Sequence, residues 1–190
     1  MTDLFAAIQH RRSIGKVKQD AVPQEQIERL LEAAIWAPNH RRTEPWKFFV
    51  MEGEGRRVLG RAYADIALSQ VSGLSAEEEA EQRSNHEKKA FRSPIVIAVA
   101  VSPAEDANVT EIEEYAAVHA AVQNMLLAAH ALGLGAVWRT GDPMYHPIMR
   151  EAFGLSGREQ LVGMIYVGYP DMEAPQSKRI PAAEKTVWLR

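Results

Sequence analysis

The chain of 190 residues contains no cysteine. This absence excludes disulfides, thiolate nucleophiles, iron–sulfur clusters and zinc sites built on thiolates. It also fits a reducing compartment, so we expect a cytoplasmic location. The first residues lack the basic and apolar regions of a signal peptide. No apolar run approaches the roughly 20 residues that a membrane-spanning helix needs, so we expect no membrane partner.

An excess of charge of one sign is absent as well. The formal net charge is −3, so no strong overall field favours nucleic acid as a partner, and we expect none. Hydrophobic residues make up 46% and charged residues 25% of the chain, which is typical of globular proteins. The length predicts a single domain over residues 1–190, either alone or as one subunit of an oligomer.

Several motifs of common enzyme sites are missing. No Gly-x-Gly-x-x-Gly or Gly-x-x-x-x-Gly-Lys-Ser/Thr follows a predicted strand, which disfavours a doubly wound nucleotide-binding fold. A bound phosphate would therefore depend on arginine side chains. There is no Gly-x-Ser-x-Gly nucleophile elbow, and the spacing of His119 and His130 does not match a metal pair. We therefore expect no metal site and assign no catalytic side chain.

The apolar patterning predicts an α+β fold with strands near residues 46, 94, 136 and 161. The run at 94–101 is apolar at every position, which is typical of a strand covered on both faces. Helices are predicted from a Thr2 N-cap to Arg11, from Pro23 to Trp36, over 56–70 and over 111–134. The last of these is the longest and has a broad apolar surface, which suits the centre of the fold or a subunit interface.

Two further segments differ from this pattern. Residues 75–89 are mostly charged, and Ser75 with Glu78 matches a capping box, so we expect an exposed helix or a mobile segment, with a lid as the alternative. The polar tail that starts at residue 171 ends in apolar residues at 187–189. An apolar terminus needs a surface to cover it, and a partner subunit is the expected one.

Three polar and aromatic clusters lie at the ends of predicted elements: Arg11-Arg12-Ser13, Pro38 to Trp46, and Trp138-Arg139-Thr140. Guanidinium groups present a planar fork of donors that suits phosphate, and aromatic side chains suit a flat ring. Together they indicate a phosphorylated aromatic cofactor. The structural alternatives are cations at a helix C-terminus, a sharp bend between prolines, and tryptophans that only fill the core.

The same clusters carry a family resemblance. A first helix that ends in Arg-Arg-Ser, the pattern Ala-Pro-x₆-Pro-Trp-x-Phe from Ala37, and Gly-Ala-Val-Trp-Arg-Thr-Gly at 135–141 resemble the FMN-dependent nitroreductases. The combination is most similar to the small, single-domain, YdjA-like branch, and the resemblance runs from Leu4 to about Pro170. Glu44 departs from the glutamine that usually precedes Pro-Trp in this family.

The resemblance implies a three-layer fold in which helices flank a central, mostly antiparallel sheet. It also implies an intertwined homodimer with two FMN molecules at the interface, and a tail over 171–190 that reaches the partner. Arg11, Arg12 and Ser13 would contact the FMN phosphate and ribityl chain. Trp36, Pro38 and His40 would reach the flavin from the other subunit.

By the same resemblance, Trp138, Arg139 and Thr140 would complete the phosphate or ring pocket. Arg41, Arg42 and Glu44 receive no role; the two arginines could recognise an anionic substrate or a phosphate of the nicotinamide cofactor.

The implied activity is a ping-pong reaction. NADH or NADPH delivers a hydride to flavin N5 and leaves, and an electron-poor nitroaromatic or quinone then accepts electrons at the same flavin face. One alternative is a specialised flavin enzyme of the dehalogenase, dehydrogenase or flavin-destroying type. The other is a redox sensor that binds FMN without turnover.

Overall fold

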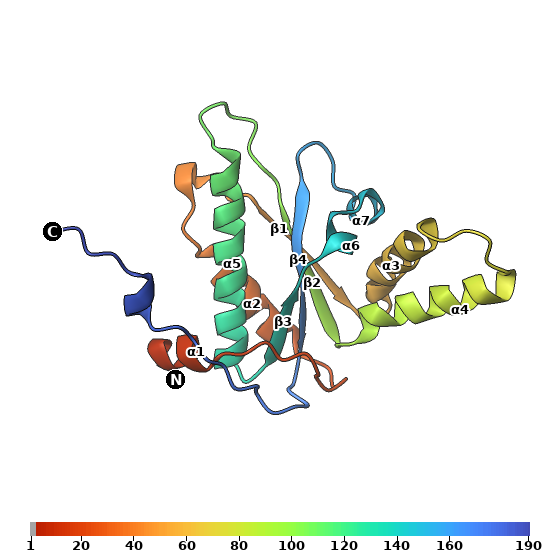
Figure 1. Cartoon of the computed structure of the whole chain (residues 1–190), viewed down its shortest axis with the longest axis horizontal. Coiled ribbons are helices and arrows are strands. Elements are labelled where there is room, and N and C mark those ends of the chain that lie inside the picture. Colours follow the sequence, from red (N-terminus) through yellow and green to blue (C-terminus); the bar gives the residue numbers. More distant parts are fainter. Residues whose placement is uncertain (1–2) are drawn as a thin grey trace.

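The computed structural model describes residues 3–190. Its core is one four-stranded sheet in the order β1-β2-β4-β3, and neighbouring strands pair antiparallel throughout (Figure 1). The strands are β1 (Trp46–Glu52), β2 (Ile95–Val101), β3 (Gly135–Arg139) and β4 (Gln160–Gly168). The predicted strand positions are confirmed, and the antiparallel pairing agrees with the argument against a doubly wound fold.

Seven α-helices lie in the described part of the chain. They are α1 (Leu4–His10), α2 (Gln24–Ile35), α3 (Arg57–Ser69), α4 (Ala76–Glu87), α5 (Glu111–Ala131), α6 (Asp142–Tyr145) and α7 (Pro147–Ala152). Short 3₁₀ helices add η1 (His40–Arg42), η2 (Gly53–Arg56), η3 (Lys88–Phe91) and η4 (Ala182–Lys185).

Helices cover both faces of the sheet, which confirms the three-layer α+β prediction. Every residue of β2 is buried. Because side chains alternate along a strand, Ile97 and Val99 pack with α2 and α5, whereas Val96 and Ala98 pack with α3 and α7. This double coverage explains why the sequence of β2 is apolar without interruption.

The segment after α1 runs beside the open edge of β3. Ser13 forms a parallel bridge with Ala136, and the Ile14 amide donates to the Ala136 carbonyl at 3.0 Å. The two segments approach so closely that a Cβ added to Gly135 would lie only 2.8 Å from Ile14 Cγ2. The contact carries the Arg-Arg-Ser motif to the strand that ends in Arg139.

Helix α1 exposes its apolar side chains. The proposed cap Thr2 lies outside the described residues, and the Asp3 carboxylate accepts from the Ala6 amide at 3.0 Å. Leu4, Phe5 and Ile8 are 61%, 71% and 51% exposed. The single chain therefore leaves an apolar face of α1 uncovered.

The predicted capping box at Ser75 is confirmed, and the charged segment forms the exposed helix α4. This helix packs along α3 through an ion pair of 2.7 Å between Arg83 and Asp65. A Cβ on Gly60 would lie 3.1 Å from the Glu87 carbonyl oxygen, so the two helices approach closely at this end.

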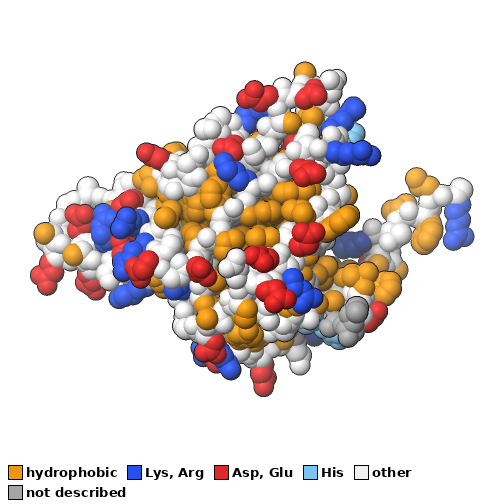
Figure 2. Space-filling view, turned by 180° about the vertical axis from the view of Figure 1, so that it is seen from behind, with side chains coloured by type: hydrophobic (Ala, Val, Ile, Leu, Met, Phe, Trp, Pro, Cys, Tyr) orange, Lys and Arg blue, Asp and Glu red, His pale blue; other side chains and the backbone are white. Residues whose placement is uncertain are grey.

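The end of the C-terminal tail, from η4 on, stands clear of the body beyond α1 (Figure 1). On the rear face, apolar side chains gather over the middle of the molecule (Figure 2). Val187, Trp188 and Leu189 are 83%, 77% and 92% exposed. Among residues 3–190, no helix is long and apolar enough to cross a membrane.

Candidate functional site

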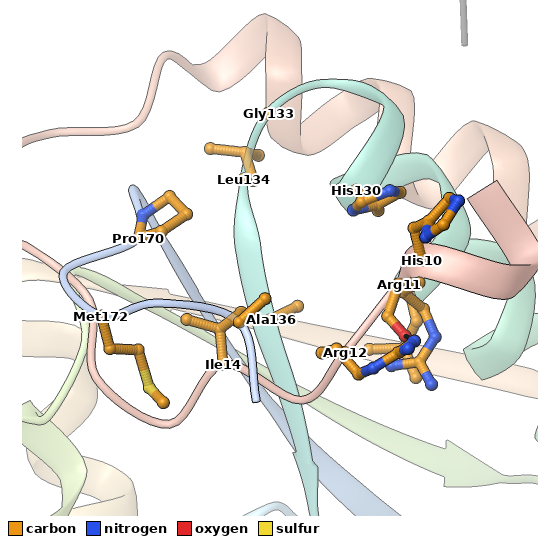
Figure 3. Close-up of a pocket in the computed structure, with 12 residues that line it drawn as sticks. His10, Arg11, Arg12, Ile14, His130, Gly133, Leu134, Ala136, Pro170 and Met172 are labelled. Carbon is orange, nitrogen blue, oxygen red and sulfur yellow. Dashed lines mark hydrogen bonds between the residues drawn. The ribbon is translucent and has the colours of Figure 1, made fainter. Parts of the chain in front are cut away.

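One cavity, of about 310 Å³, lies between α1, the C-terminal half of α5 and the start of β3; we call it the α1–α5 cavity. His10 and His130 lie side by side next to the guanidinium groups of Arg11 and Arg12 (Figure 3). Tail residues such as Met172 close its opposite side. Four nitrogen-bearing side chains therefore converge here: His10 from α1, His130 from α5, and Arg11 and Arg12 from the segment directly after α1.

The α1–α5 cavity favours an anion. Burial lowers the pKa of Arg11, and the nearby Arg12 and Arg179 lower it further. Burial also lowers the pKa of His130, with added repulsion from Arg11, His10 and Arg12. No carboxylate lines the described cavity, and Arg11 Nε is buried without a hydrogen-bond partner. A compact anion such as a phosphate would relieve both the repulsion and the missing bond.

The three residues of the first motif are placed differently. Arg12 Nη1 donates to the Gln9 carbonyl at 2.6 Å and Arg12 Nε donates to the Pro175 carbonyl at 3.1 Å. Arg12 thus joins the end of α1 to the tail, while Arg11 keeps an unpartnered donor. Ser13 is exposed at the sheet edge.

Arg179 is a residue that sequence reasoning missed. It lies close enough to Arg11 to lower the pKa of that guanidinium. The two are separated by 168 positions, and no local pattern links them. Only the folded path of the tail reveals this third cation.

A second cavity, of about 660 Å³, lies on the opposite face of the sheet between α3, η3, β3 and α6; we call it the α3–β3 cavity. Arg139 and Thr140 border it from β3, and Lys89 and Arg92 border it from the α4–β2 connection. The Arg139 guanidinium lies 5.4 Å from the centre of the Tyr166 ring, and Arg139 Nε is buried without a hydrogen-bond partner.

Two neutral tyrosine hydroxyls border this second cavity. The Tyr63 and Tyr166 hydroxyls are 3.4 Å apart, and Tyr166 donates to the Lys89 carbonyl at 3.3 Å. Burial raises the pKa of both phenols, so both stay protonated near neutral pH.

The third predicted cluster is divided between the two faces of the sheet. The Trp138 indole packs with the core beneath α5, and Trp138 Nε1 donates to the Val162 carbonyl at 3.1 Å. Arg139, one position later, stacks on Tyr166 on the other face, because neighbouring side chains of a strand alternate. Trp138, Arg139 and Thr140 all border the α3–β3 cavity, but Trp138 turns its ring to the α5 face of the sheet.

The second cluster lies at the far end of α5. Trp36 is 78% exposed and its indole donates to Glu32 at 3.1 Å, and Pro38 is exposed too. His40 Nδ1 lies 2.5 Å from a carboxylate oxygen of Glu113, in the first turn of α5. A helix of 21 residues is about 30 Å long, so one chain does not bring this cluster to Arg11.

The loop of this cluster has a strained backbone. Arg41, Arg42 and Glu44 have φ values of 68°, 56° and 50°, in the left-handed region that residues other than glycine seldom adopt. Such strain persists only where the surrounding structure holds it, and it gathers at functional sites.

The loop is fixed by a bond within it and by contacts to the start of α5. The Glu44 amide donates to Asn39 Oδ1 at 2.7 Å within the loop. The Thr43 hydroxyl donates to Glu114 Oε1 at 2.6 Å and, with the His40–Glu113 contact, holds the loop on α5. Glu114 is fully buried and its other oxygen accepts from the Ala104 amide at 3.2 Å. The result is a fixed loop that presents Arg41 and Arg42 at the surface.

Comparison with known proteins decides the family. The sequence profile of the nitroreductase family matches residues 8–169. The chain belongs to the nitroreductase family. It is 33% identical over 179 residues to the "Putative NAD(P)H nitroreductase YdjA" of Escherichia coli K12, with 94% of each chain covered. It is 37% identical over 180 residues to YfhC of Bacillus subtilis 168, which bears the same designation, with 94% of this chain and 90% of YfhC covered.

Solved structures agree. A nitroreductase-like family protein of Bacillus cereus superimposes with a TM-score of 0.84 at 33% identity, covering 100% of this chain and 97% of that one. A nitroreductase family protein of Desulfovibrio desulfuricans, solved in complex with FMN, has a TM-score of 0.75 at 29% identity, covering 100% and 98%. The predicted family and the three-layer α+β fold of this nitroreductase family member are therefore confirmed, and its relatives support an oxidoreductase. Among the described residues, no group of three or more His, Asp or Glu side chains is placed to hold a metal ion.

Proposed function

We propose that this nitroreductase family member is an FMN-dependent NAD(P)H oxidoreductase that reduces nitroaromatics, quinones or similar electron-poor acceptors. The observation that carries the proposal is the pair Arg11 and Arg139. Each is a partly buried guanidinium whose Nε lacks a protein partner; Arg11 precedes Ser13 in the chain, and Arg139 lies beside Gly15.

The residues present fit FMN. Arg11, with Arg179 and Arg12 nearby, would hold the phosphate, which would supply the partner that Arg11 Nε lacks. Gly15 lies beside Arg139, since a Cβ placed on it would be 4.0 Å from Arg139 Nη2. The Ser13 hydroxyl, exposed at this edge, would meet the ribityl chain. A relative of the same family is solved with FMN, which supports the assignment.

When bound, FMN would take a hydride from NADH or NADPH and pass the electrons to the acceptor. Arg139 and Thr140 would orient the ring from the end of β3, and the neutral Tyr63 hydroxyl, beside Tyr166, would donate a hydrogen bond into the α3–β3 cavity. No side chain is assigned as a general acid or base.

The site is proposed to be shared between two copies. Trp36, Pro38 and His40 lie at one end of α5 and Arg11 lies at the other, so an antiparallel pairing of two α5 helices would bring them together. The same pairing would cover the exposed face of α1. We propose that residues 1–190 act as one unit and that tail 171–190 reaches the partner.

The test is a visible spectrum of the purified protein followed by anaerobic addition of NADH or NADPH. Bound flavin that bleaches, and recovers with a nitroaromatic or a quinone, is the expected result. Flavin that stays oxidised would favour the redox sensor. Bleaching without recovery by either acceptor would favour a specialised flavin enzyme. Failure to bind added FMN would overturn the proposal.

A further inference from the structure

The α3–β3 cavity carries an uncompensated positive charge. Lys89 and Arg92 border it from the α4–β2 connection, and Arg139 borders it from β3. Within residues 3–190, none of these three side chains pairs with a carboxylate at salt-bridge distance. Asp142 is the only carboxylate among the described residues that line the cavity.

Lys89 is held in place without being neutralised. Its Nζ lies 2.9 Å from Nδ1 of His86, the neighbouring lining residue from α4. Burial lowers the pKa of His86, and the Lys89 ammonium lowers it further, so the imidazole is a neutral acceptor near pH 7. A neutral partner fixes the ammonium and leaves its full charge in the cavity.

The remaining wall suits a flat ring. Ile66 and Val137 give it apolar surface, and the Tyr166 ring lies beneath the Arg139 guanidinium. Planar and apolar surfaces bind aromatic groups, whereas the cations at the α4 end bind a negative substituent.

We propose that the α3–β3 cavity selects electron-poor aromatic acceptors that carry a carboxylate or another anionic substituent, bound by Lys89 and Arg92. This inference rests on the proposed function and names the acceptor class. The FMN phosphate is not the anion in question, because its proposed partner Arg11 lines the cavity on the other face of the sheet and Arg179 lies near Arg11. The remaining rival source is a phosphate of the nicotinamide donor.

The experiment compares 4-nitrobenzoate with its neutral methyl ester as acceptors for the FMN-loaded protein. Wild type and Arg92→Gln are measured with Lys88→Gln as control, since Lys88 is an adjacent exposed cation outside the cavity lining. We expect Arg92→Gln to lower the kcat/KM ratio of 4-nitrobenzoate to the ester about fivefold, mainly through the KM of the anion. Lys88→Gln should keep the wild-type ratio.

The outcomes are separable. An unchanged ratio in Arg92→Gln, or a rise in the KM of NADH or NADPH in place of a fall in the ratio, would overturn the inference and leave the proposed function standing. Wild type that reduces neither acceptor would contradict the proposed function. Calorimetric titration with benzoate then tests anion binding to the α3–β3 cavity without turnover. Binding that Arg92→Gln weakens supports the inference, and no binding to wild type overturns it.

Discussion

The two cavities on opposite faces of the sheet use arginine in different ways. In the α1–α5 cavity, Arg12 donates to the Gln9 and Pro175 carbonyls, and Arg11, His10 and His130 lie close together around a volume of about 310 Å³. The α3–β3 cavity is larger, at about 660 Å³, and its wall includes tyrosines and apolar side chains as well as Lys89, Arg92 and Arg139. The first arrangement suits a small, concentrated anion, and the second suits a ring with one charged end.

The difference shows that arginines in a sequence motif do not share one role. Burial and backbone contacts decide whether a guanidinium stabilises the fold or keeps a donor free for a ligand. Arg11 and Arg139 keep such a donor at Nε, whereas Arg12 Nε and Nη1 donate to backbone carbonyls.

The largest effect is expected where the sheet between the two cavities is packed most tightly. A Cβ on Gly163 would lie 1.9 Å from Trp138 Nε1. Gly163→Ala should therefore lower the free energy of unfolding by about 3 kcal/mol through overpacking, measured by chemical denaturation. Gly55→Ala is the control, because a Cβ there meets nothing within 4 Å. A Gly163→Ala protein as stable as the control would show that Trp138 is free to move.

The next effect concerns the tail that Arg12 fastens beside the α1–α5 cavity. Deletion of Val187–Arg190 removes three exposed apolar side chains, which we expect to be covered by a partner subunit. The dimer dissociation constant should rise roughly tenfold or more, measured by sedimentation. Deletion of Arg190 alone is the control. A wild-type sedimentation profile after the longer deletion would contradict the shared site.

The smallest effect concerns His130. Its pKa is lowered by burial and by Arg11, His10 and Arg12, so an anion in the α1–α5 cavity should raise it. By linkage, inorganic phosphate should bind FMN-free protein more tightly as the pH falls through the pKa of His130. NMR titration measures this, with the ring of His40 at the far end of α5 as the control. A His130 pKa that phosphate does not raise would place the anion elsewhere.

Much of the fold could be predicted from the sequence. The apolar run at 94–101 predicted the doubly covered strand, and Ser75 with Glu78 predicted the start of α4. The exposure of Leu4 and Phe5 could not be predicted, because an apolar helix face gives no sign of whether the same chain or another copy covers it.

The site was predicted less completely. The motifs named Arg11 and Arg139, but only the pleat of β3 separates Trp138 from Arg139. Arg179 and Lys89 reach their cavities through the path of the tail and the packing of α4 on α3. These are tertiary features that no local spacing encodes.

The most direct test is a fluorescence titration of FMN-free protein with FMN, comparing wild type with Arg11→Ala and Arg139→Ala. Each change removes a charge-assisted bond of about 1.5–3 kcal/mol, so each should weaken binding by about 10- to 100-fold. Arg12→Ala should lose less, and Arg29→Ala, an exposed cation on α2, should bind as wild type does. Wild-type affinity in either Arg11→Ala or Arg139→Ala would contradict the account.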